Sequence, residues 1–262
     1  RSNEKRIAKT LQSYDHLAAL TKSVVKDYLD LNVNEQSITI LPNGVDLDWF
    51  KPKLTTADIR KNLSWPIDKD IILTTGRNHP KKGYDMIPHI ANSLRSRGLR
   101  FKWYVVGLGT DQINRELVAL NLNDYVETIN EIGVTSESHP ELKFPDRQLV
   151  NMYQAADIYA FPSMLETFGM VQLEAMAAGT TVVSTDAPGC KDVVTHMDNG
   201  LQAISGDKEN FTNQVATLLE NKQLRKSLSD RASNFVNDYG WPSIASKYES
   251  VFEKTIYDRQ TI

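Results

Sequence analysis

The chain has 262 residues, 40% of them hydrophobic and 24% charged, which is typical of a folded globular protein and excludes an intrinsically disordered one. Its formal net charge of −3 does not favour nucleic acid or an acidic membrane surface as the main partner. The single cysteine, Cys190, excludes an intrachain disulfide and fits a reducing compartment, and no apolar run approaches the ~20 residues that cross a bilayer.

The first 42 residues predict a small unit of two helices and two short strands. The expected elements, in order, are a helix at 3–12, a strand at 16–20, a helix at 22–31 and a strand at 37–41. The turn residues Pro42, Asn43 and Gly44 then interrupt the chain, so a linker is expected over 43–53. The polar N-terminus has neither Met nor a signal-peptide pattern, and we expect this unit to be the tail of a domain in a longer protein.

From residue 70 onward, short apolar runs alternate with longer amphipathic segments. Strands are predicted at 70–75, 101–106, 125–129, 158–161, 180–184 and 200–204. Helical spacing is found at 84–97, 112–119, 146–155 and 169–178. This alternation predicts an α/β fold, a Rossmann-like parallel sheet of about six strands with helices on both faces. Ligands of such sheets lie at the carboxyl ends of the strands, where the loops are therefore expected to form a site.

Only helices are predicted after residue 206. They are expected at 211–219, 224–239 and 244–256, the last within a longer helical segment at 241–257. That segment has an apolar stripe at near-helical spacing, formed by Trp241, Ile244, Tyr248, Val251 and Phe252. We expect that this helix does not complete its packing within the main sheet unit alone and that it contacts the segment 1–42.

The segment 161–179 (FPSMLETFGMVQLEAMAAG) carries two carboxylates on and before a helix that is apolar nearly all round. A buried Glu174 would need a hydrogen-bond partner, and the alternative is that it lies on the one wet face of the helix. Glu166 is eight positions away, up to ~12 Å, which is too far for a glycoside hydrolase pair and suits the two ends of an elongated ligand. The free N–H groups of residues 168–171 would bind a diphosphate or sugar hydroxyls.

The loop 76–83 (GRNHPKKG) follows a predicted strand and combines nitrogen-bearing side chains with two glycines. It suggests a phosphate pocket, and the alternative is a solvated basic turn. Three further patterns do not predict a site. Gly107 and Gly109 resemble a dinucleotide fingerprint that lacks its last glycine, Asp46 and Asp48 lie in the linker as turn residues, and the scattered histidines show no metal-ligand spacing.

Together these motifs resemble those of a family 4 glycosyltransferase, a retaining enzyme of the two-domain GT-B type. The similar segments are 41–46 (LPNGVD), 76–77 (GR), 82–83 (KG), 106–109 (VGLG), 156–157 (AD), 162–163 (PS), and Glu166 followed by 174–177 (EAMA). The resemblance covers residues 38–194. It implies that the chain is the C-terminal half of a GT-B fold, with the tail of the N-terminal acceptor domain at 1–42, the donor-binding domain at 43–239 and a helix returning towards the N-terminal domain at 240–262.

The resemblance also implies roles for individual residues. Arg77 and Lys82 would contact the donor diphosphate, Glu166 the donor sugar and Glu174 the ribose. The implied catalytic residues are Glu166, Arg77 and Lys82, and the implied donor-binding residues are Gly76, Arg77, Lys82, Gly107, Thr167, Phe168, Gly169, Met170, Val171 and Glu174. The leaving phosphate would take the acceptor proton, and neither a metal nor a cofactor is implied beyond the nucleotide sugar itself.

The implied activity is that of a hexosyltransferase, which moves a sugar from a nucleoside-diphosphate sugar, UDP-linked by preference, to a sugar, lipid or protein acceptor. A cytoplasmic location is expected, with peripheral membrane contact through the absent acceptor domain and no role in nucleic-acid binding. This chain alone is expected to be inactive. The connection 130–147 is longer than expected and leaves the base and the sugar open. The alternatives are a nucleotide-sugar epimerase of the same architecture and a non-catalytic donor-binding module.

Overall fold

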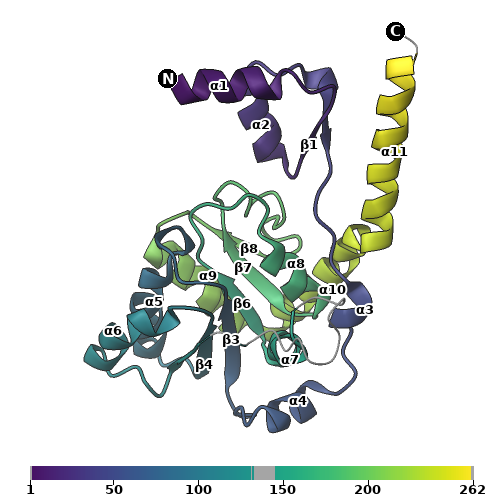
Figure 1. The fold of residues 1–262 in the computed structure, drawn as a ribbon. Coiled ribbons are helices and arrows are strands. Elements are labelled where there is room, and N and C mark those ends of the chain that lie inside the picture. Colours follow the sequence, from purple (N-terminus) through teal and green to yellow (C-terminus); the bar gives the residue numbers. More distant parts are fainter. Residues whose placement is uncertain (1, 131, 133–144, 261–262) are drawn as a thin grey trace.

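The computed structural model describes residues 2–130, 132 and 145–260, so most of the long connection at 130–147 lies outside the described residues. The main body is built on one six-stranded sheet in the order β5-β4-β3-β6-β7-β8, in which every neighbouring pair is parallel (Figure 1). Its strands are β3 Asp70–Thr75, β4 Phe101–Val106, β5 Val126–Ile129, β6 Ile158–Phe161, β7 Thr181–Thr185 and β8 Leu201–Ala203. The predicted parallel sheet of about six strands is confirmed.

Helices cover both faces of this sheet (Figure 1). The described helices are α1 Ser2–Leu11, α2 Lys22–Asp30, α3 Leu47–Phe50, α4 Thr56–Asn62, α5 Ile87–Ser96, α6 Asn114–Ala119, α7 Arg147–Ala155, α8 Met170–Ala177, α9 Lys208–Glu220, α10 Lys222–Val236 and α11 Trp241–Gln260. One apolar cluster joins the sheet to α4, α7, α8 and α10, and a second joins the other face to α5, α6 and α9. Strands buried on both faces have continuous apolar runs, which is why they were visible in the sequence.

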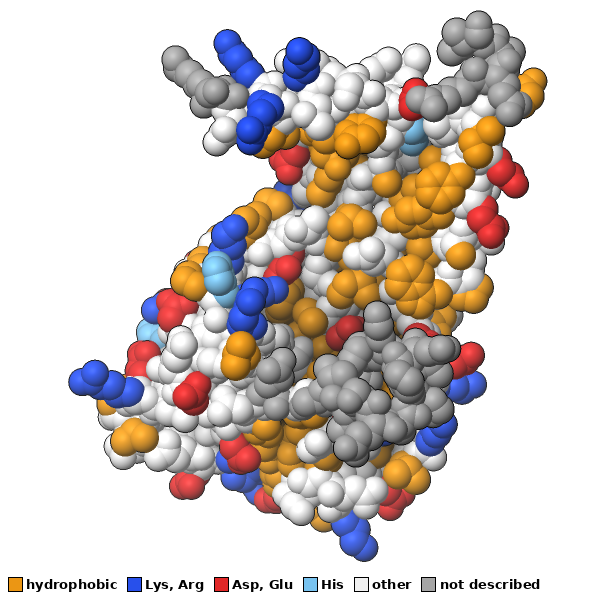
Figure 2. Space-filling view, viewed as in Figure 1, with side chains coloured by type: hydrophobic (Ala, Val, Ile, Leu, Met, Phe, Trp, Pro, Cys, Tyr) orange, Lys and Arg blue, Asp and Glu red, His pale blue; other side chains and the backbone are white. Residues whose placement is uncertain are grey.

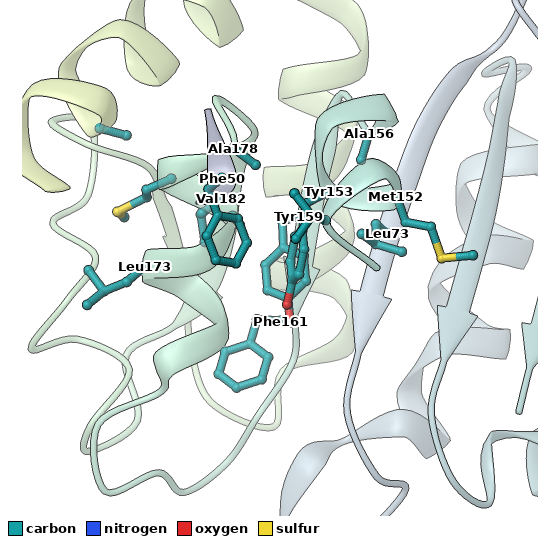
Figure 3. Packing of buried hydrophobic residues seen from close by; sticks show 14 of the residues in the cluster. Phe50, Leu73, Met152, Tyr153, Ala156, Tyr159, Phe161, Leu173, Ala178 and Val182 are labelled. Carbon is teal, nitrogen blue, oxygen red and sulfur yellow. The ribbon is translucent and has the colours of Figure 1, made fainter. Parts of the chain in front are cut away.

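The first cluster lies under the segment 161–179 and contains several aromatic side chains. Figure 3 shows Tyr153 of α7 beside Tyr159 of β6, with Phe161 and Leu173 nearby. All four side chains are fully buried. The rings of Tyr153 and Tyr159 have their centroids 5.4 Å apart. A closely packed core therefore fixes the end of β6 and the start of α8 relative to each other.

The N-terminal unit has its own two-stranded parallel sheet, β1 Leu17–Ala19 with β2 Ile38–Ile40, and lies apart from the main sheet (Figure 1). Helix α11 runs beside the chain that leads from this unit to the main body. Tyr248 donates to the carbonyl of Leu41 at 3.3 Å, which is a contact of the kind predicted between the last helix and residues 1–42. The apolar side chains Trp241, Phe252 and Ile256 stay at least half exposed, and Figure 2 shows hydrophobic side chains gathered over α11.

Two short helices were not predicted. The expected linker at 43–53 contains α3, whose Phe50 is 2% exposed in the core, and α4 follows it. Helix α4 is polar apart from Ile59, so it has almost no apolar periodicity, although Thr55 caps it by accepting from the N–H of Asp58 at 3.2 Å. The predicted starts of two other helices, near residues 84 and 112, are 3₁₀ turns in the structure.

A group of ion pairs joins helices to the sheet at the amino ends of β3 and β6. Asp157 accepts from Arg60 of α4 at 2.6 Å and from the N–H of Ile71 at 2.7 Å. Arg225 of α10 pairs with Asp70 at 2.9 Å and lies 3.4 Å from Asp157. Because the side chains of Arg60 and Arg225 are only 9% and 11% exposed, this network is largely removed from water. In the described part of the chain, no helix is both long and apolar enough to cross a membrane.

Candidate functional site

A cleft of about 880 Å³ opens at the carboxyl ends of β3 and β4. Its walls come from the loops after β3, β4, β6 and β7 and from the first turns of α2 in the N-terminal unit. Figure 2 shows basic side chains on the flank of the main body below that unit. The cleft is lined by Ser23, Val24, Asp27, Thr75, Gly76, Arg77, His79, Lys81, Lys82, Val106, Gly107, Leu108, Ile132, Leu149, Leu165, Glu166, Thr167 and Pro188.

Two glycines form the floor by direct backbone contact. Gly76 and Gly107 have φ values of +126° and +140°, and a Cβ on Gly107 would lie 2.1 Å from the carbonyl oxygen of Gly76. The N–H of Gly76 donates to Val106 at 2.9 Å, so the pairing of β3 with β4 continues into the loops. Any side chain at position 107 would therefore push the loops apart. The exposed guanidinium of Arg77 follows, and among the described residues it has no hydrogen-bond or ion-pair partner.

Lys82 and Glu166 form an ion pair inside the cleft. Lys82 ends the 3₁₀ turn Pro80–Lys82, and Gly83 after it packs on the loop that follows β6, since a Cβ there would lie 2.2 Å from the carbonyl oxygen of Pro162. The same Glu166 oxygen, Oε1, accepts from the Ser163 hydroxyl at 2.9 Å. The side chains of Lys82 and Glu166 are 30% and 13% exposed, so both charged groups are partly removed from water. Their attraction is therefore stronger than that of an exposed ion pair.

The main chain of Glu166 is held by the loop after β7. Its N–H donates to the carbonyl of Pro188 at 3.0 Å, and a Cβ on Gly189 would lie 2.2 Å from its carbonyl oxygen. Asp192 accepts from the N–H of Gly189 at 3.1 Å and from the hydroxyl of Ser23 at 2.6 Å. Asp192 therefore connects the start of α2 to the loop that supports Glu166.

Glu174 does not line the cleft but lies behind it, on α8. It accepts a hydrogen bond from the Tyr153 hydroxyl at 2.9 Å, which in turn is 2.7 Å from the hydroxyl of Thr75 on the cleft wall. Burial raises the pKa of the Glu174 carboxyl, and the bond from Tyr153 opposes part of this rise. Of the two alternatives for this residue, the structure shows the partly buried, hydrogen-bonded one.

The start of α8 offers unpaired backbone donors. Gly169 has φ +74° at the N-cap position, and Gln172 is held by the hydroxyl of Ser184 at 2.6 Å. The N–H groups of residues 167–171 make no hydrogen bond within the described part of the chain. Such a helix terminus favours anions and hydroxyl oxygens because its amide dipoles point outward.

The structure places part of the predicted site in the cleft wall and the rest beyond it, at the start of α8 and on that helix. In the cleft wall are Gly76, Arg77, Lys82, Gly107, Glu166 and Thr167. Outside that wall are Phe168, Gly169, Met170, Val171 and Glu174. The sequence did not point to Thr75, Tyr153 or Asp192, because their partners are distant in the chain. No group of His, Cys, Asp and Glu side chains suited to a metal ion is present among the described residues.

The model of the protein family described as Glycosyl transferases group 1 matches residues 55–235, which include the whole six-stranded sheet. Two D-inositol 3-phosphate glycosyltransferases are similar in sequence. That of Kineococcus radiotolerans is 28% identical over 262 residues, covering 95% of this chain and 59% of the relative. That of Xylanimonas cellulosilytica is 30% identical over 248 residues, covering 91% and 56%. The chain thus spans less than two thirds of the length of these relatives.

Solved structures share the fold. Sucrose-phosphate synthase from Thermosynechococcus elongatus has a TM-score of 0.82 at 22% identity, covering 98% of this chain and 62% of that one. Anabaena HepE in complex with UDP-glucose has a TM-score of 0.82 at 17% identity, covering 97% and 68%. At such identities the likeness establishes the fold alone, and it confirms the predicted α/β sheet with helices on both faces, the C-terminal half of a GT-B fold.

Proposed function

The chain belongs to the glycosyl transferases group 1 family, and we propose that it forms the donor-binding part of a retaining glycosyltransferase that uses a nucleoside-diphosphate sugar, with UDP as the favoured nucleotide. The observation that carries the proposal is the meeting of Arg77, Lys82 and Glu166 in one cleft at the carboxyl ends of parallel strands. HepE, which shares the fold, was crystallised with UDP and with UDP-glucose, and this supports a uridine nucleotide. The family match does not favour an epimerase or a non-catalytic module.

Each charged group has a distinct part in this proposal. The diphosphate binds Arg77, which is unpaired, and Lys82, which it shares with Glu166. Glu166 accepts hydrogen bonds from the sugar, and the open N–H groups at the start of α8 add donors for its oxygens. The leaving diphosphate takes the proton of the attacking acceptor on the same face. The chain therefore contributes positioning and charge stabilisation rather than a strong base.

Arg77→Ala and Lys82→Ala are each expected to weaken UDP binding about 10- to 150-fold, while uridine binding changes less than about 2-fold. Each variant removes a charge-assisted contact to phosphate, worth about 1.5–3 kcal/mol. Lys82→Ala is expected to have the larger effect because it also leaves Glu166 without its cation beside the diphosphate.

Isothermal titration calorimetry with UDP and uridine at one fixed ionic strength measures both losses. Arg115→Ala on α6 is the matched control, since its exposed side chain lies outside the cleft wall. Equal losses for uridine and UDP would show that the loop 76–83 is only a basic turn.

A further inference from the structure

A chain of buried hydroxyl groups connects Glu174 to the floor of the cleft. The hydroxyl of Thr75 is 2.7 Å from that of Tyr153 and 2.9 Å from that of Tyr159. Tyr153 donates to Glu174 Oε2 at 2.9 Å. Both tyrosines are fully buried and Thr75 is 4% exposed, so water does not compete for these hydrogen bonds.

The direction of this chain follows from the number of protons available. Each hydroxyl has one proton to donate, and an ionised carboxylate can only accept. Because Tyr153 gives its proton to Glu174, Thr75 must donate to Tyr153. The proton of Tyr159 is then directed to Thr75, whose hydroxyl oxygen lies at 2.9 Å and whose carbonyl oxygen lies at 3.4 Å. The four groups therefore form one aligned series that ends on Glu174.

We propose that Tyr153 is a positioning residue for nucleotide binding, which orients the Glu174 carboxylate towards the ribose hydroxyls and couples it through Thr75 to the diphosphate loop at Gly76 and Arg77. The inference rests on the proposed function, and it adds a residue that does not itself touch the nucleotide. One carboxylate oxygen, Oε2, is engaged by Tyr153. The other, Oε1, accepts no hydrogen bond from any described residue, and in this proposal it is the oxygen that accepts from the ribose.

The hydrogen bond from Tyr153 also stabilises the ionised form of the Glu174 carboxyl. Burial raises the pKa of this carboxyl and the hydrogen bond from Tyr153 lowers it. The titratable groups facing it are the phenols of Tyr153 and Tyr159, which stay protonated because burial raises their pKa well above the ordinary value. No charged side chain of α3, α7, α10, β6 or β7, the elements packed on α8, forms an ion pair with Glu174 in the described structure.

The test is Tyr153→Phe, with Tyr159→Phe as the matched control. Both variants remove one buried hydroxyl that contacts Thr75, but only the first removes the donor to Glu174. Binding of UDP and of 2′,3′-dideoxy-UDP is measured by calorimetry on this chain between about pH 5.5 and pH 8. We expect Tyr153→Phe to weaken UDP binding about 5- to 20-fold, by loss of an oriented charged acceptor, and dideoxy-UDP binding less than 2-fold. Tyr159→Phe is expected to change both by less than about 2-fold.

The pH dependence separates positioning from simple loss of packing. Ionised Glu174 accepts from the ribose, so the preference for UDP over dideoxy-UDP is lost as the pH falls through its pKa. Without the Tyr153 hydroxyl that pKa is higher, and the preference should disappear at a higher pH than in the wild type. The two ligands titrate alike at phosphate, so the ratio of their dissociation constants cancels that contribution.

Glu174→Gln distinguishes failure of the inference from failure of the proposed function. If Glu174→Gln leaves the preference for UDP unchanged, the ribose-binding role of Glu174 is wrong. If Glu174→Gln removes the preference while Tyr153→Phe keeps it with an unchanged pH profile, the positioning role of Tyr153 is overturned and the donor site stands. Should Tyr153→Phe fail to fold, Tyr153→Leu removes the same donor to Glu174, and a preference for UDP no smaller than that of the wild type would equally overturn the inference.

Discussion

Asp157→Ala is expected to lower the free energy of unfolding by about 3–5 kcal/mol, towards the lower end because its side chain is 21% exposed. The substitution removes the carboxylate partner of Arg60, whose guanidinium stays buried beside the carbonyl of Ala155, and it also leaves the N–H of Ile71 without its acceptor. Arg225 loses its second carboxylate as well. Urea denaturation followed by tryptophan fluorescence measures this loss as a lower midpoint at an unchanged slope.

Asp68→Ala is the matched control for this loss. Asp68 pairs with Arg100 at 2.7 Å, but these side chains are 63% and 72% exposed. Water screens such a pair, so its removal is expected to cost less than about 1 kcal/mol. If Asp157→Ala costs no more than Asp68→Ala, the network at the amino ends of β3 and β6 contributes nothing to stability beyond an exposed pair.

The sequence predicted the sheet well because its strands are buried on both faces. β3, β4 and β6 begin and end at the predicted residues, and their apolar runs bury almost completely. The strand order could not be predicted, because it depends on which crossover packs on which face. The polar helix α4 shows the limit of periodicity, since it is anchored by Ile59 and by the ion pair of Arg60 rather than by an apolar stripe.

The candidate site was predictable where its residues lie in one loop and not where they meet across the fold. The loop 76–83 and the segment 161–179 each follow a strand, so the meeting of Lys82 with Glu166 follows from the topology. The contacts of Tyr153 with Thr75 and of Ser23 with Asp192 join positions 78 and 169 residues apart, and no local spacing encodes them. The loop 76–83 has features of both alternatives given for it. Arg77 is exposed, as expected for a solvated basic turn, while Lys82 is paired with Glu166 inside the cleft, as expected for a pocket.

Glu166→Gln is expected to lower kcat of the longer protein that contains this chain by about 100- to 1,000-fold, equivalent to about 2.7–4 kcal/mol of transition-state stabilisation. The glutamine keeps the shape of the side chain, but it removes the negative charge that faces the sugar. Positive charge develops on the sugar as the glycosidic bond breaks, so the carboxylate acts most strongly in the transition state. Affinity for UDP itself should stay within about 3-fold of the wild type, because UDP lacks the transferred sugar that Glu166 is proposed to contact and Lys82 remains in place.

Glu174→Ala is the internal comparison, because the ribose does not react. Its loss should weaken UDP and UDP-sugar binding alike, by about 1–3 kcal/mol for a lost charged hydrogen bond, and should therefore appear mainly in KM. Calorimetry with UDP and with a UDP-sugar on both variants, followed by steady-state kinetics, separates the two effects. If Glu166→Gln abolishes UDP binding and Glu174→Ala leaves it unchanged, the two assignments are reversed. If neither variant changes binding or turnover, both carboxylates are structural, and Glu166 serves only to join Lys82 of the loop after β3 to Ser163 of the loop after β6.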